Sequence, residues 1–292
     1  MRVGDHTTVI AVDGGGTRCR LVLDGPGGRV AVERGSANVS SDFEAAMGEV
    51  EAGLSELAAR SGRSLAQIQA LPIYLGLAGM TGEDVAARVI ARLNLSRARV
   101  EGDHPAALRG ALGRADGALA HLGTGSFFAV QIGGQARFAG GWGARLGDEA
   151  SAFWVARAAL AAALVAEDGL DEKTDLTRAL IAHYGSADQM SARANTESPG
   201  KIGALAPMVT EGAAAGDPLG LRILRAGADH IAGVITAMGW QAGMALCLTG
   251  GLGPVYRAYL PAPMAAALRA PLAKPVEGGL DLARDFAAEA RA

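Results

Sequence analysis

Two glycine-rich turns, far apart in the sequence, constrain the fold of this chain more than any other feature. The first reads Asp13-Gly14-Gly15-Gly16-Thr17 and the second reads Gly123-Thr124-Gly125-Ser126, and each directly follows an apolar run. A glycine turn at a strand end lets backbone N–H groups approach a phosphate without interference from Cβ atoms. Two such turns suggest that a nucleotide is held between two similar halves of the chain.

Composition excludes several classes of protein. At 292 residues the chain is long enough for two domains, and its net charge of −3 comes from interspersed acidic and basic residues. We therefore expect neither nucleic acid nor an anionic membrane as a partner. The apolar stretch over 158–166 is about half as long as a membrane-spanning helix requires, and no signal peptide is visible. Cys19 and Cys247 lack metal-ligand spacing, so we expect a cytoplasmic protein without a zinc site or a disulfide framework.

Apolar runs and helical periodicity alternate along the chain. Three short strands joined by glycine turns are predicted near the start, followed by a helix over 42–60 and a buried strand over 73–77. The later part repeats this order, with strands over 117–122 and 127–132 around the second turn and a long alanine-rich helix after it. Residues 171–232 are predicted to be mainly helical.

This repetition predicts the α/β class, with two domains around a cleft. We place the N-terminal domain at residues 1–104 and the C-terminal domain at 105–278. A terminal helix over 279–291 is expected to pack on the N-terminal domain.

Asp13 and Asp103 are carboxylates predicted to follow strand ends. Asp13 could hold a phosphate-bound Mg²⁺ through waters while the adjacent glycine amides meet the phosphates; the alternative is a simple Asp-Gly turn. Asp103 could be a general base for a substrate hydroxyl, or the N-cap of a helix that begins near Pro105. No Gly-x-x-x-x-Gly-Lys-Ser/Thr segment is present, so the nucleotide device is not a P-loop.

Two further glycine segments have the composition of binding loops. Glycines flank Trp142 in Gly140-Gly141-Trp142-Gly143, which allows close backbone approach beside a flat apolar ring that suits a sugar. Asp148 and Glu149 follow shortly afterwards, where helix capping is the simpler interpretation. Thr249-Gly250-Gly251 follows an apolar strand and could lie against a nucleoside, although a tight turn explains it equally well.

In their order these segments resemble the BadF/BadG-type ATPase family, whose kinase branch includes N-acetylglucosamine kinases. The family belongs to the superfamily of acetate and sugar kinases, heat-shock chaperone ATPases and actin. The resemblance extends from Val9 to about Asp285 and also includes Gly35-Ser36-Ala37-Asn38, Gly76-Leu77-Ala78-Gly79 and Gly102-Asp103. It implies two ribonuclease H-like (actin-like ATPase) domains, with ATP and a sugar in the interdomain cleft and hinge closure during turnover.

The resemblance also implies a role for each motif. The ATP phosphates would bind Gly14, Gly15, Gly16 and Thr17 of the first turn and Gly123, Thr124, Gly125 and Ser126 of the second. The adenosine would lie near Thr249, Gly250 and Gly251. Asp103 would be the catalytic base and Asp13 would hold Mg²⁺. The amino sugar would contact Asn38, Asp103, Gly141, Trp142 and Asp148.

Three departures from the family pattern bear on the identity of the sugar. The kinases usually have Asn-Asp-Ala where this chain has Gly102-Asp103-His104, and often have glycine where Ala150 stands. Phe127 takes the place of a sugar-binding asparagine of the animal enzymes. We expect a kinase for the 6-hydroxyl of N-acetylglucosamine, with glucosamine and N-acetylmuramic acid as alternatives, and the possibility of a homodimer stays open.

Two other function classes compete with a kinase. An ATP-driven activator of a dehydratase or reductase would carry a [4Fe–4S] cluster between two subunits, which needs closely placed cysteines, and Cys19 and Cys247 are poorly suited to that. A non-catalytic sugar sensor would not need Asp13, Asp103 and both phosphate turns.

Overall fold

The computed structural model describes residues 7–289, which form two compact units with one sheet each. Among the described residues, the first unit comprises 7–114 and 271–289, and the second comprises Ala115–Ala270. The first unit therefore extends ten residues beyond the predicted boundary at residue 104, because the helix that follows this position packs against the C-terminal helix of the same unit.

The sheet of the first unit has the strand order β3-β2-β1-β4-β5. Its strands are β1 (Val9–Gly14), β2 (Cys19–Gly25), β3 (Gly28–Arg34), β4 (Ile73–Leu77) and β5 (Ala98–Glu101). The first three are antiparallel, whereas β4 and β5 run parallel to β1. Parallel strands end at the same edge of a sheet, so the last residues of β1, β4 and β5 come together there.

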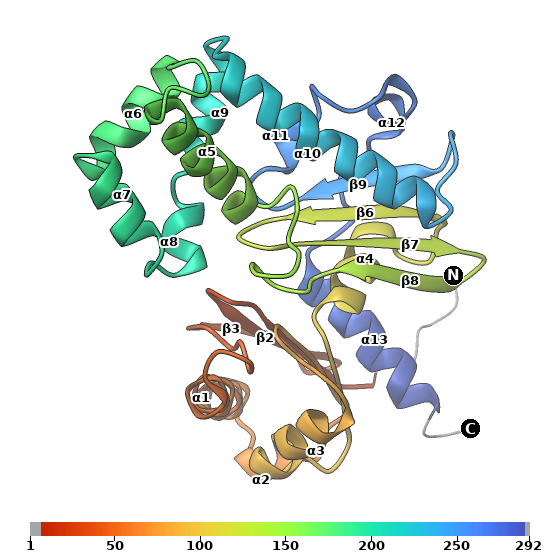
Figure 1. Ribbon diagram of the computed structural model, residues 1–292. Coiled ribbons are helices and arrows are strands. Elements are labelled where there is room, and N and C mark those ends of the chain that lie inside the picture. The colour runs from red at the N-terminus through yellow and green to blue at the C-terminus, as the bar shows by residue number, and fades with distance from the viewer. Residues whose placement is uncertain (1–6, 290–292) are drawn as a thin grey trace. The chain divides into compact units, whose positions relative to one another are not determined.

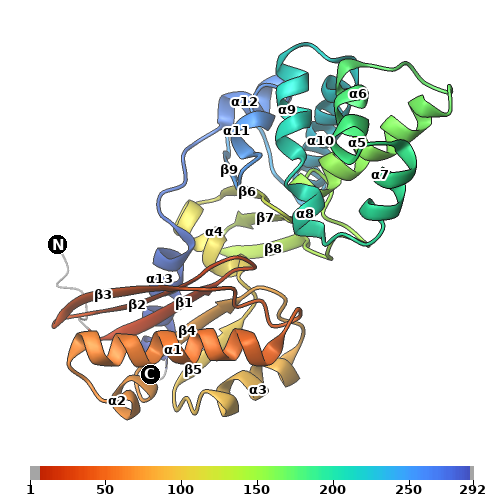
Figure 2. The same ribbon diagram turned by 90° about the vertical axis from the view of Figure 1, so that its left-hand side faces the viewer.

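Helices cover both faces of this sheet (Figure 2). They are α1 (Phe43–Ser61), α2 (Leu65–Gln69), α3 (Glu83–Arg92), α4 (His104–Leu112) and α13 (Pro275–Glu289). Helix α1 begins where the Asp42 side chain accepts a hydrogen bond from Ala45 N–H and ends at Gly62, whose φ of 68° is left-handed. It packs on β2 and β3, whereas α13 lies on β1 and β4 beside α4. The α4–α13 face holds Tyr74 and Leu280 in a small core of its own.

The sheet of the second unit has the order β8-β7-β6-β9. Its strands are β6 (Gly117–Leu122), β7 (Ser126–Ile132), β8 (Gln135–Gly140) and β9 (Ala245–Thr249), with β9 parallel to β6 and the others antiparallel. Strand β8 is missing from the sequence-based expectation, because it is an edge strand whose residues are mostly exposed or half-buried and show no apolar alternation.

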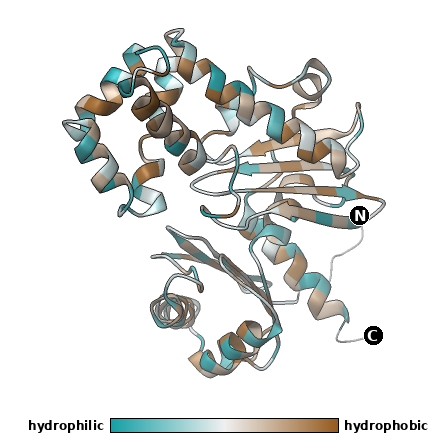
Figure 3. Cartoon of the chain, in the orientation of Figure 1, coloured by the Kyte–Doolittle hydropathy of each residue, from teal (hydrophilic) through white to brown (hydrophobic). Residues whose placement is uncertain are grey.

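Helices make up most of the rest of the second unit (Figure 1). They are α5 (Ala152–Glu167), α6 (Asp175–Tyr184), α7 (Ala187–Ala194), α8 (Pro199–Gly203), α9 (Ala206–Ala214), α10 (Pro218–Ala237), α11 (Gly253–Tyr256) and α12 (Ala262–Ala267). Apolar residues run along α5 (Figure 3), which packs with α10 on the core that includes Phe128 of the sheet. The mainly helical character predicted for residues 171–232 is confirmed.

None of the helices described over residues 7–289 combines the length and the apolar composition that crossing a bilayer would require.

Candidate active site

The first glycine turn joins β1 to β2 and is tied to two neighbouring segments. Gly15 N–H donates to the carbonyl of Arg18 at 2.9 Å, which closes the turn, and Ala37 N–H donates to the carbonyl of Gly15 at 3.1 Å. Ala78, just after β4, donates to the carbonyl of Gly14 at 2.7 Å. The turn is thus fixed by backbone hydrogen bonds, whereas Gly16 and Thr17 remain exposed and able to contact a ligand.

Asp13 lies at the end of β1, directly before this turn, with its side chain 14% exposed. Burial raises the pKa of this carboxyl group to about 6; Arg20 opposes the shift and Asp103 adds to it. Burial disfavours the charged form because the carboxylate has lost water, and a nearby cation or hydrogen-bond donor would stabilise it. A cation bound beside Asp13 would therefore lower this pKa and favour the ionised carboxylate.

Asp103 follows β5 and precedes α4, at the same sheet edge as Asp13. Its side chain makes no capping hydrogen bond to the helix and lies 3.6 Å from Nε2 of His104. Gly76 of β4 permits this placement, because a Cβ at that position would lie only 3.3 Å from Cα of Asp103. The residue occupies the N-cap position, but the capping interaction that would explain it structurally is absent, so its carboxylate is available for chemistry.

Asn38 lies between β3 and α1, and its neighbours Ala37 and Val39 donate backbone hydrogen bonds to the first turn at Gly15 and to Ala78 after β4. Its Oδ1 accepts hydrogen bonds from Ser40 N, Ser40 Oγ and Ser41 N at 3.0, 2.8 and 3.3 Å. A Cβ on Gly16 would lie 3.9 Å from Asn38 Nδ2, so the amide nitrogen is directed to the turn. Asn38 can therefore donate to a ligand held there.

Sequence reasoning missed Glu101 and Arg20, which also lie at this edge. Glu101 accepts a hydrogen bond from the buried Tyr74 hydroxyl at 2.7 Å, and Arg20 approaches Asp13. Strand register could have revealed both, since Arg20, Asp13, Gly76 and Glu101 are neighbours across four strands. That register follows only once the strand order is known.

The second glycine turn joins β6 to β7 and is covered by the start of α5. Ala152 and Phe153 donate backbone hydrogen bonds to the carbonyls of Gly123 and Thr124 at 2.9 and 3.4 Å. Ser126 Oγ donates to the carbonyl of Glu149 at 2.7 Å. The shape of this turn is therefore set largely by backbone hydrogen bonds.

Asp148 is buried beneath the second turn. Its Oδ1 accepts a hydrogen bond from Ser126 N–H at 3.4 Å, and a Cβ on Gly125 would lie 2.8 Å from its Oδ2. The N-cap of α5 is Ser151, so neither Asp148 nor Glu149 has the capping role that offered the simpler interpretation. Asp148 and Ala150 both have left-handed backbone, with φ of 61° and 65°.

Trp142 lies on the loop between β8 and α5 and is 76% exposed. Gly141 N–H donates to the carbonyl of Ser126 at 2.9 Å, which fastens the start of the loop to the second turn. Gly140, Gly141 and Gly143 have φ between 72° and 84°, which a residue with a side chain rarely adopts. The indole is therefore exposed to solvent on a loop that is anchored to the second turn at Gly141.

Thr249 is the last residue of β9, and Gly250, which follows it, packs against the second turn. A Cβ on Gly250, whose φ is 81°, would lie 2.7 Å from the backbone nitrogen of Gly123. Thr249 Oγ1 lies 3.1 Å from Nδ1 of His121, and the His121 ring stacks on Phe127 with a centroid distance of 5.3 Å. His121 is another residue that sequence reasoning missed, because only the parallel pairing of β6 with β9 places it beside Thr249.

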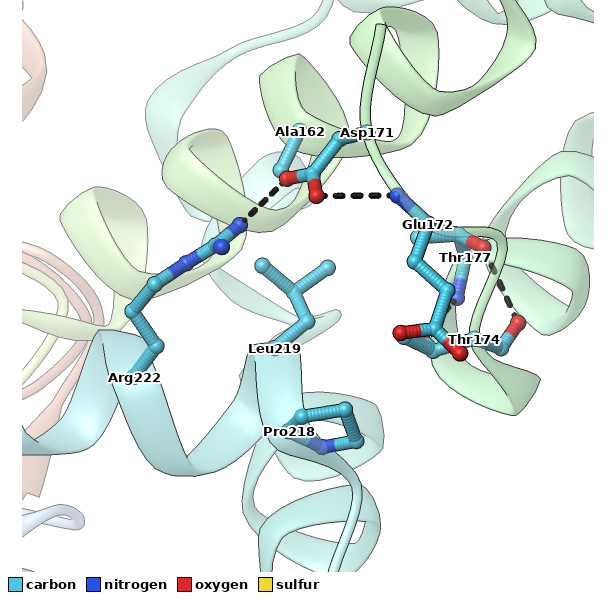
Figure 4. A pocket seen from close by; sticks show the side chains of 8 residues that line it. All are labelled: Ala162, Asp171, Glu172, Thr174, Thr177, Pro218, Leu219 and Arg222. Atoms are coloured by element: carbon cyan, nitrogen blue, oxygen red, sulfur yellow. Dashed lines mark hydrogen bonds and ion pairs between the residues drawn. The ribbon is translucent and has the colours of Figure 1, made fainter. Parts of the chain in front are cut away.

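Two cavities lie in the helical part of the second unit, away from these motifs. One of about 590 Å³ is lined by α6 and α9 residues, and a smaller one of about 60 Å³ is drawn in Figure 4. Asp171 in the smaller cavity is paired with Arg222 at 2.8 Å and accepts from Glu172 N–H at 2.8 Å. None of the predicted site residues lines either cavity.

The structure therefore assembles the predicted residues into two groups, one in each unit. The first unit brings together Asp13, Gly14, Gly15, Gly16, Thr17, Asn38 and Asp103. The second brings together Gly123, Thr124, Gly125, Ser126, Gly141, Trp142, Asp148, Thr249, Gly250 and Gly251.

A magnesium ion fits the first group. Among the described residues there is no cluster of three or more metal-binding side chains. Mg²⁺ retains several waters, however, and is commonly held by one or two carboxylates together with substrate phosphates. The partly desolvated Asp13, with Asp103 near enough to raise its pKa, provides that type of donor.

Comparison with known proteins identifies the relatives of the chain. Residues 10–260 match the model of the BadF/BadG/BcrA/BcrD ATPase family. The glucosamine kinase GspK of Vibrio cholerae serotype O1 is 26% identical over 280 residues, which cover 93% of this chain and 94% of GspK.

Proteins of known structure are similar to this chain as well. A candidate N-acetylglucosamine kinase of Chromobacterium violaceum is 30% identical, with a TM-score of 0.83 over 95% of this chain and 99% of its own. A ROK family glucokinase of Streptomyces griseus, in complex with glucose and AMPPNP, is 20% identical, with a TM-score of 0.57 over 95% and 99%. The predicted fold class, α/β with two ribonuclease H-like units of the actin-like ATPase type, is confirmed.

Proposed function

The chain belongs to the BadF/BadG/BcrA/BcrD ATPase family, and from this premise we propose that it is an ATP-dependent kinase of an amino sugar. The observation that carries the proposal is the position of Asp13 and Asp103 at one sheet edge beside a glycine turn. Such an edge supplies a cation-binding carboxylate and a proton acceptor together. The relatives named as kinases of glucosamine and of N-acetylglucosamine support the substrate class.

In the proposed reaction a sugar hydroxyl oxygen forms a bond to the γ-phosphorus of ATP. The bond between that phosphorus and the β–γ bridging oxygen breaks, ADP leaves, and the hydroxyl proton passes to the Asp103 carboxylate. When bound, Mg²⁺ would neutralise charge on the phosphates, and Asp13 is the residue proposed to hold it. Catalysis of this type depends mostly on positioning and on stabilisation of negative charge.

Each glycine segment has a proposed ligand. The phosphates are assigned to the exposed backbone of the first turn and to the second turn, and the adenosine is assigned to Thr249, Gly250 and Gly251. Asn38, Gly141, Trp142 and Asp148 are assigned to the sugar; for Asn38 and Trp142 this is supported by the available amide nitrogen and the exposed indole. The assignment of Asp148 rests on family resemblance, because its described contacts are with the second turn.

N-acetylglucosamine is the proposed substrate and its 6-hydroxyl the proposed acceptor. Glucosamine is the second candidate, favoured by the name of the Vibrio cholerae relative. Phe127 also favours it, because this buried ring stacks on His121 and offers no polar group to an N-acetyl substituent. N-acetylmuramic acid is the third candidate.

The two competing function classes have less support. Cys19 and Cys247 are buried in strands of different units, and burial raises the pKa of both thiols. They do not fit a shared iron–sulfur cluster, which needs accessible thiolates. A sugar sensor without catalysis would not require the carboxylate pair.

A coupled assay of ADP release tests the proposal. N-acetylglucosamine, glucosamine, N-acetylmuramic acid and glucose would each be supplied with MgATP, and the phosphorylated carbon would be located by ³¹P–¹H correlation NMR. We expect the highest kcat/KM for an N-acetylated amino sugar. A preference for glucosamine would change the proposed substrate but leave the kinase assignment in place. ADP release that does not depend on any sugar would overturn the kinase assignment.

A further inference from the structure

Arg20 is a charged residue at the first turn that neither the sequence motifs nor the proposed function uses. It lies in β2, directly across from Asp13 in β1 and from Glu33 in β3, so the three side chains form a row on one face of the sheet. Arg20 Nη1 is 3.8 Å from Asp13 Oδ2, and Nε donates to Glu33 Oε2 at 3.2 Å. Glu33 therefore orients the guanidinium toward Asp13 from the far side.

The terminal nitrogens of this guanidinium are available to a ligand. A separation of 3.8 Å between Arg20 Nη1 and Asp13 Oδ2 is too long for a hydrogen bond. Within residues 7–289, the side chain of Arg20 donates a hydrogen bond through Nε, to Glu33. The side chain is 34% exposed. Arginine carries five N–H donors in a planar fork that matches the oxygens of a phosphate.

The turn that joins β1 to β2 brings these donors to the proposed phosphate site. Asp13 precedes the turn and Arg20 lies three residues after Thr17, and the two residues pair across β1 and β2. The carboxylate and the guanidinium therefore lie side by side at the base of the turn. A bound triphosphate carries several negative charges, and a guanidinium beside the turn would add its positive charge to that of Mg²⁺ on Asp13, as electrostatic stabilisation of phosphoryl transfer requires.

We propose that Arg20 is a catalytic residue, whose Nη groups donate hydrogen bonds to the terminal phosphates of the nucleotide. Glu33 is the positioning residue that holds the guanidinium in place through Nε. The inference rests on the proposed function for its ligand, a nucleoside triphosphate, and adds a residue of this chain that contacts it. Charge-assisted bonds of this kind are about twice as strong as neutral ones.

Arg34 provides a matched control on the same sheet. Its side chain is 33% exposed and pairs with one glutamate, Glu56 of α1. It lies across from Cys19, on the face that α1 covers, and therefore points away from Asp13. Replacing Arg34 removes the same charge and one ion pair from the same sheet without touching the proposed phosphate site.

The test compares Arg20→Gln, Arg20→Lys and Arg34→Gln with the unmodified protein. Isothermal titration with Mg-AMPPNP, ADP and AMP measures nucleotide affinity, and thermal unfolding checks that each variant folds.

We expect Arg20→Gln to bind Mg-AMPPNP about tenfold more weakly than the unmodified protein does. Its affinity for AMP should be unchanged, because AMP lacks the terminal phosphates. The kcat of this variant should fall about 100-fold, as for loss of one transition-state donor. Arg20→Lys, which keeps the charge but loses the planar fork, should be intermediate, and Arg34→Gln should stay within about twofold.

The proposal would be overturned if Arg20→Gln lost affinity for AMP and AMPPNP equally. It would also be overturned if the AMPPNP affinity and kcat of Arg20→Gln matched those of Arg34→Gln. If Arg20→Gln does not fold, Arg20→Lys decides: unchanged AMPPNP affinity and kcat would also overturn it. If the unmodified protein phosphorylates no sugar, the proposed function fails, yet the comparison of AMPPNP with AMP still tests Arg20.

Discussion

The two glycine turns join equivalent strands of similarly connected sheets, yet different kinds of group surround them. Each sheet begins with three antiparallel strands and gains a parallel neighbour beside its first strand. The first turn is bordered by charged side chains, Asp13, Arg20 and Asp103. The second is enclosed by backbone hydrogen bonds from α5 and by the buried Asp148.

This difference indicates that the two turns have different roles. Exposed backbone and ionisable groups at the first turn can act on a phosphate, a metal ion and a proton. Both turns are held by backbone hydrogen bonds, but the second is also covered by the start of α5 and lies over the buried Asp148, so it is suited to holding a ligand in place. Charge substitutions at the first turn should therefore alter chemistry, whereas a side chain added at Gly125 of the second turn should alter stability.

The largest effect is expected from Asp103→Asn in the first unit. Asparagine cannot accept the hydroxyl proton, and losing a general base typically lowers kcat about 10²–10⁴-fold. AMPPNP affinity should stay nearly unchanged, because Asp103 is proposed to contact the sugar. Steady-state kinetics with a titration of AMPPNP checks both, and retention of more than about a tenth of kcat would return Asp103 to a purely structural role.

Asp13→Asn should lose Mg²⁺-dependent turnover and, at the same time, stabilise the fold. The folded pKa of about 6 lies above the unfolded value of 3.8, so the ionised carboxylate destabilises the folded state above pH 6. This cost is complete above pH 6, decreases as the pH falls from 6 to 3.8, and vanishes below 3.8, where the carboxyl group is protonated in both states. At pH 7.5 without Mg²⁺ the gain is at most about 3 kcal/mol. Thermal unfolding at pH 4 and 7.5 measures it, and an equal gain at both values would contradict the assignment.

Paired glycine substitutions probe the space around the two turns. A Cβ on Gly125 would meet Asp148 Oδ2 at 2.8 Å, whereas one on Gly16 would meet only Asn38 Nδ2 at 3.9 Å. Gly125→Ala should therefore cost about 1–3 kcal/mol, while Gly16→Ala should leave the free energy of unfolding almost unchanged. Denaturant unfolding of both variants is the measurement. Equal losses would show that Gly125 is no more tightly enclosed by Asp148 than Gly16 is by Asn38.

Trp142→Ala should raise the sugar KM by roughly tenfold with little change in the ATP KM, the pattern of lost substrate binding. The exposed indole is proposed to cover a face of the sugar. Fluorescence can test this directly in a Trp154→Phe, Trp240→Phe background, where Trp142 is the remaining tryptophan. An emission that sugar does not change, with an unaltered sugar KM, would remove Trp142 from the site.

The smallest effect is expected from Ala150→Gly. Ala150 has a φ of 65°, and left-handed backbone costs a residue with a Cβ about 1–2 kcal/mol, part of which glycine loses again in entropy. The variant should gain up to about 1 kcal/mol. Ala156→Gly, in the regular part of α5 and equally buried, should instead be destabilised. A loss in both variants would mean that the Ala150 methyl group contributes more through packing than its backbone strain costs.

The sequence by itself determined the turns, most of the strands and the long helices. Glycine positions and apolar periodicity are local signals. They predict the ends of β1 and β6, the helical region after α5, and the placement of Asp13 and Asp103 at strand ends. Strand β8 escaped because an exposed edge strand needs no apolar pattern. The capping interpretation of Asp103 could be assessed only from the absent hydrogen bond.

The tertiary structure alone decided which side chains become neighbours. Arg20 joins Asp13 through antiparallel register, Glu101 joins Tyr74 across a parallel pair, and His121 meets Thr249, which is distant in sequence. Asp148 looked like a helix cap and is instead buried under the second turn. The physical reason is that turn and helix formation depend on a few adjacent residues, whereas strand order and register follow from burying whole faces of a sheet at once.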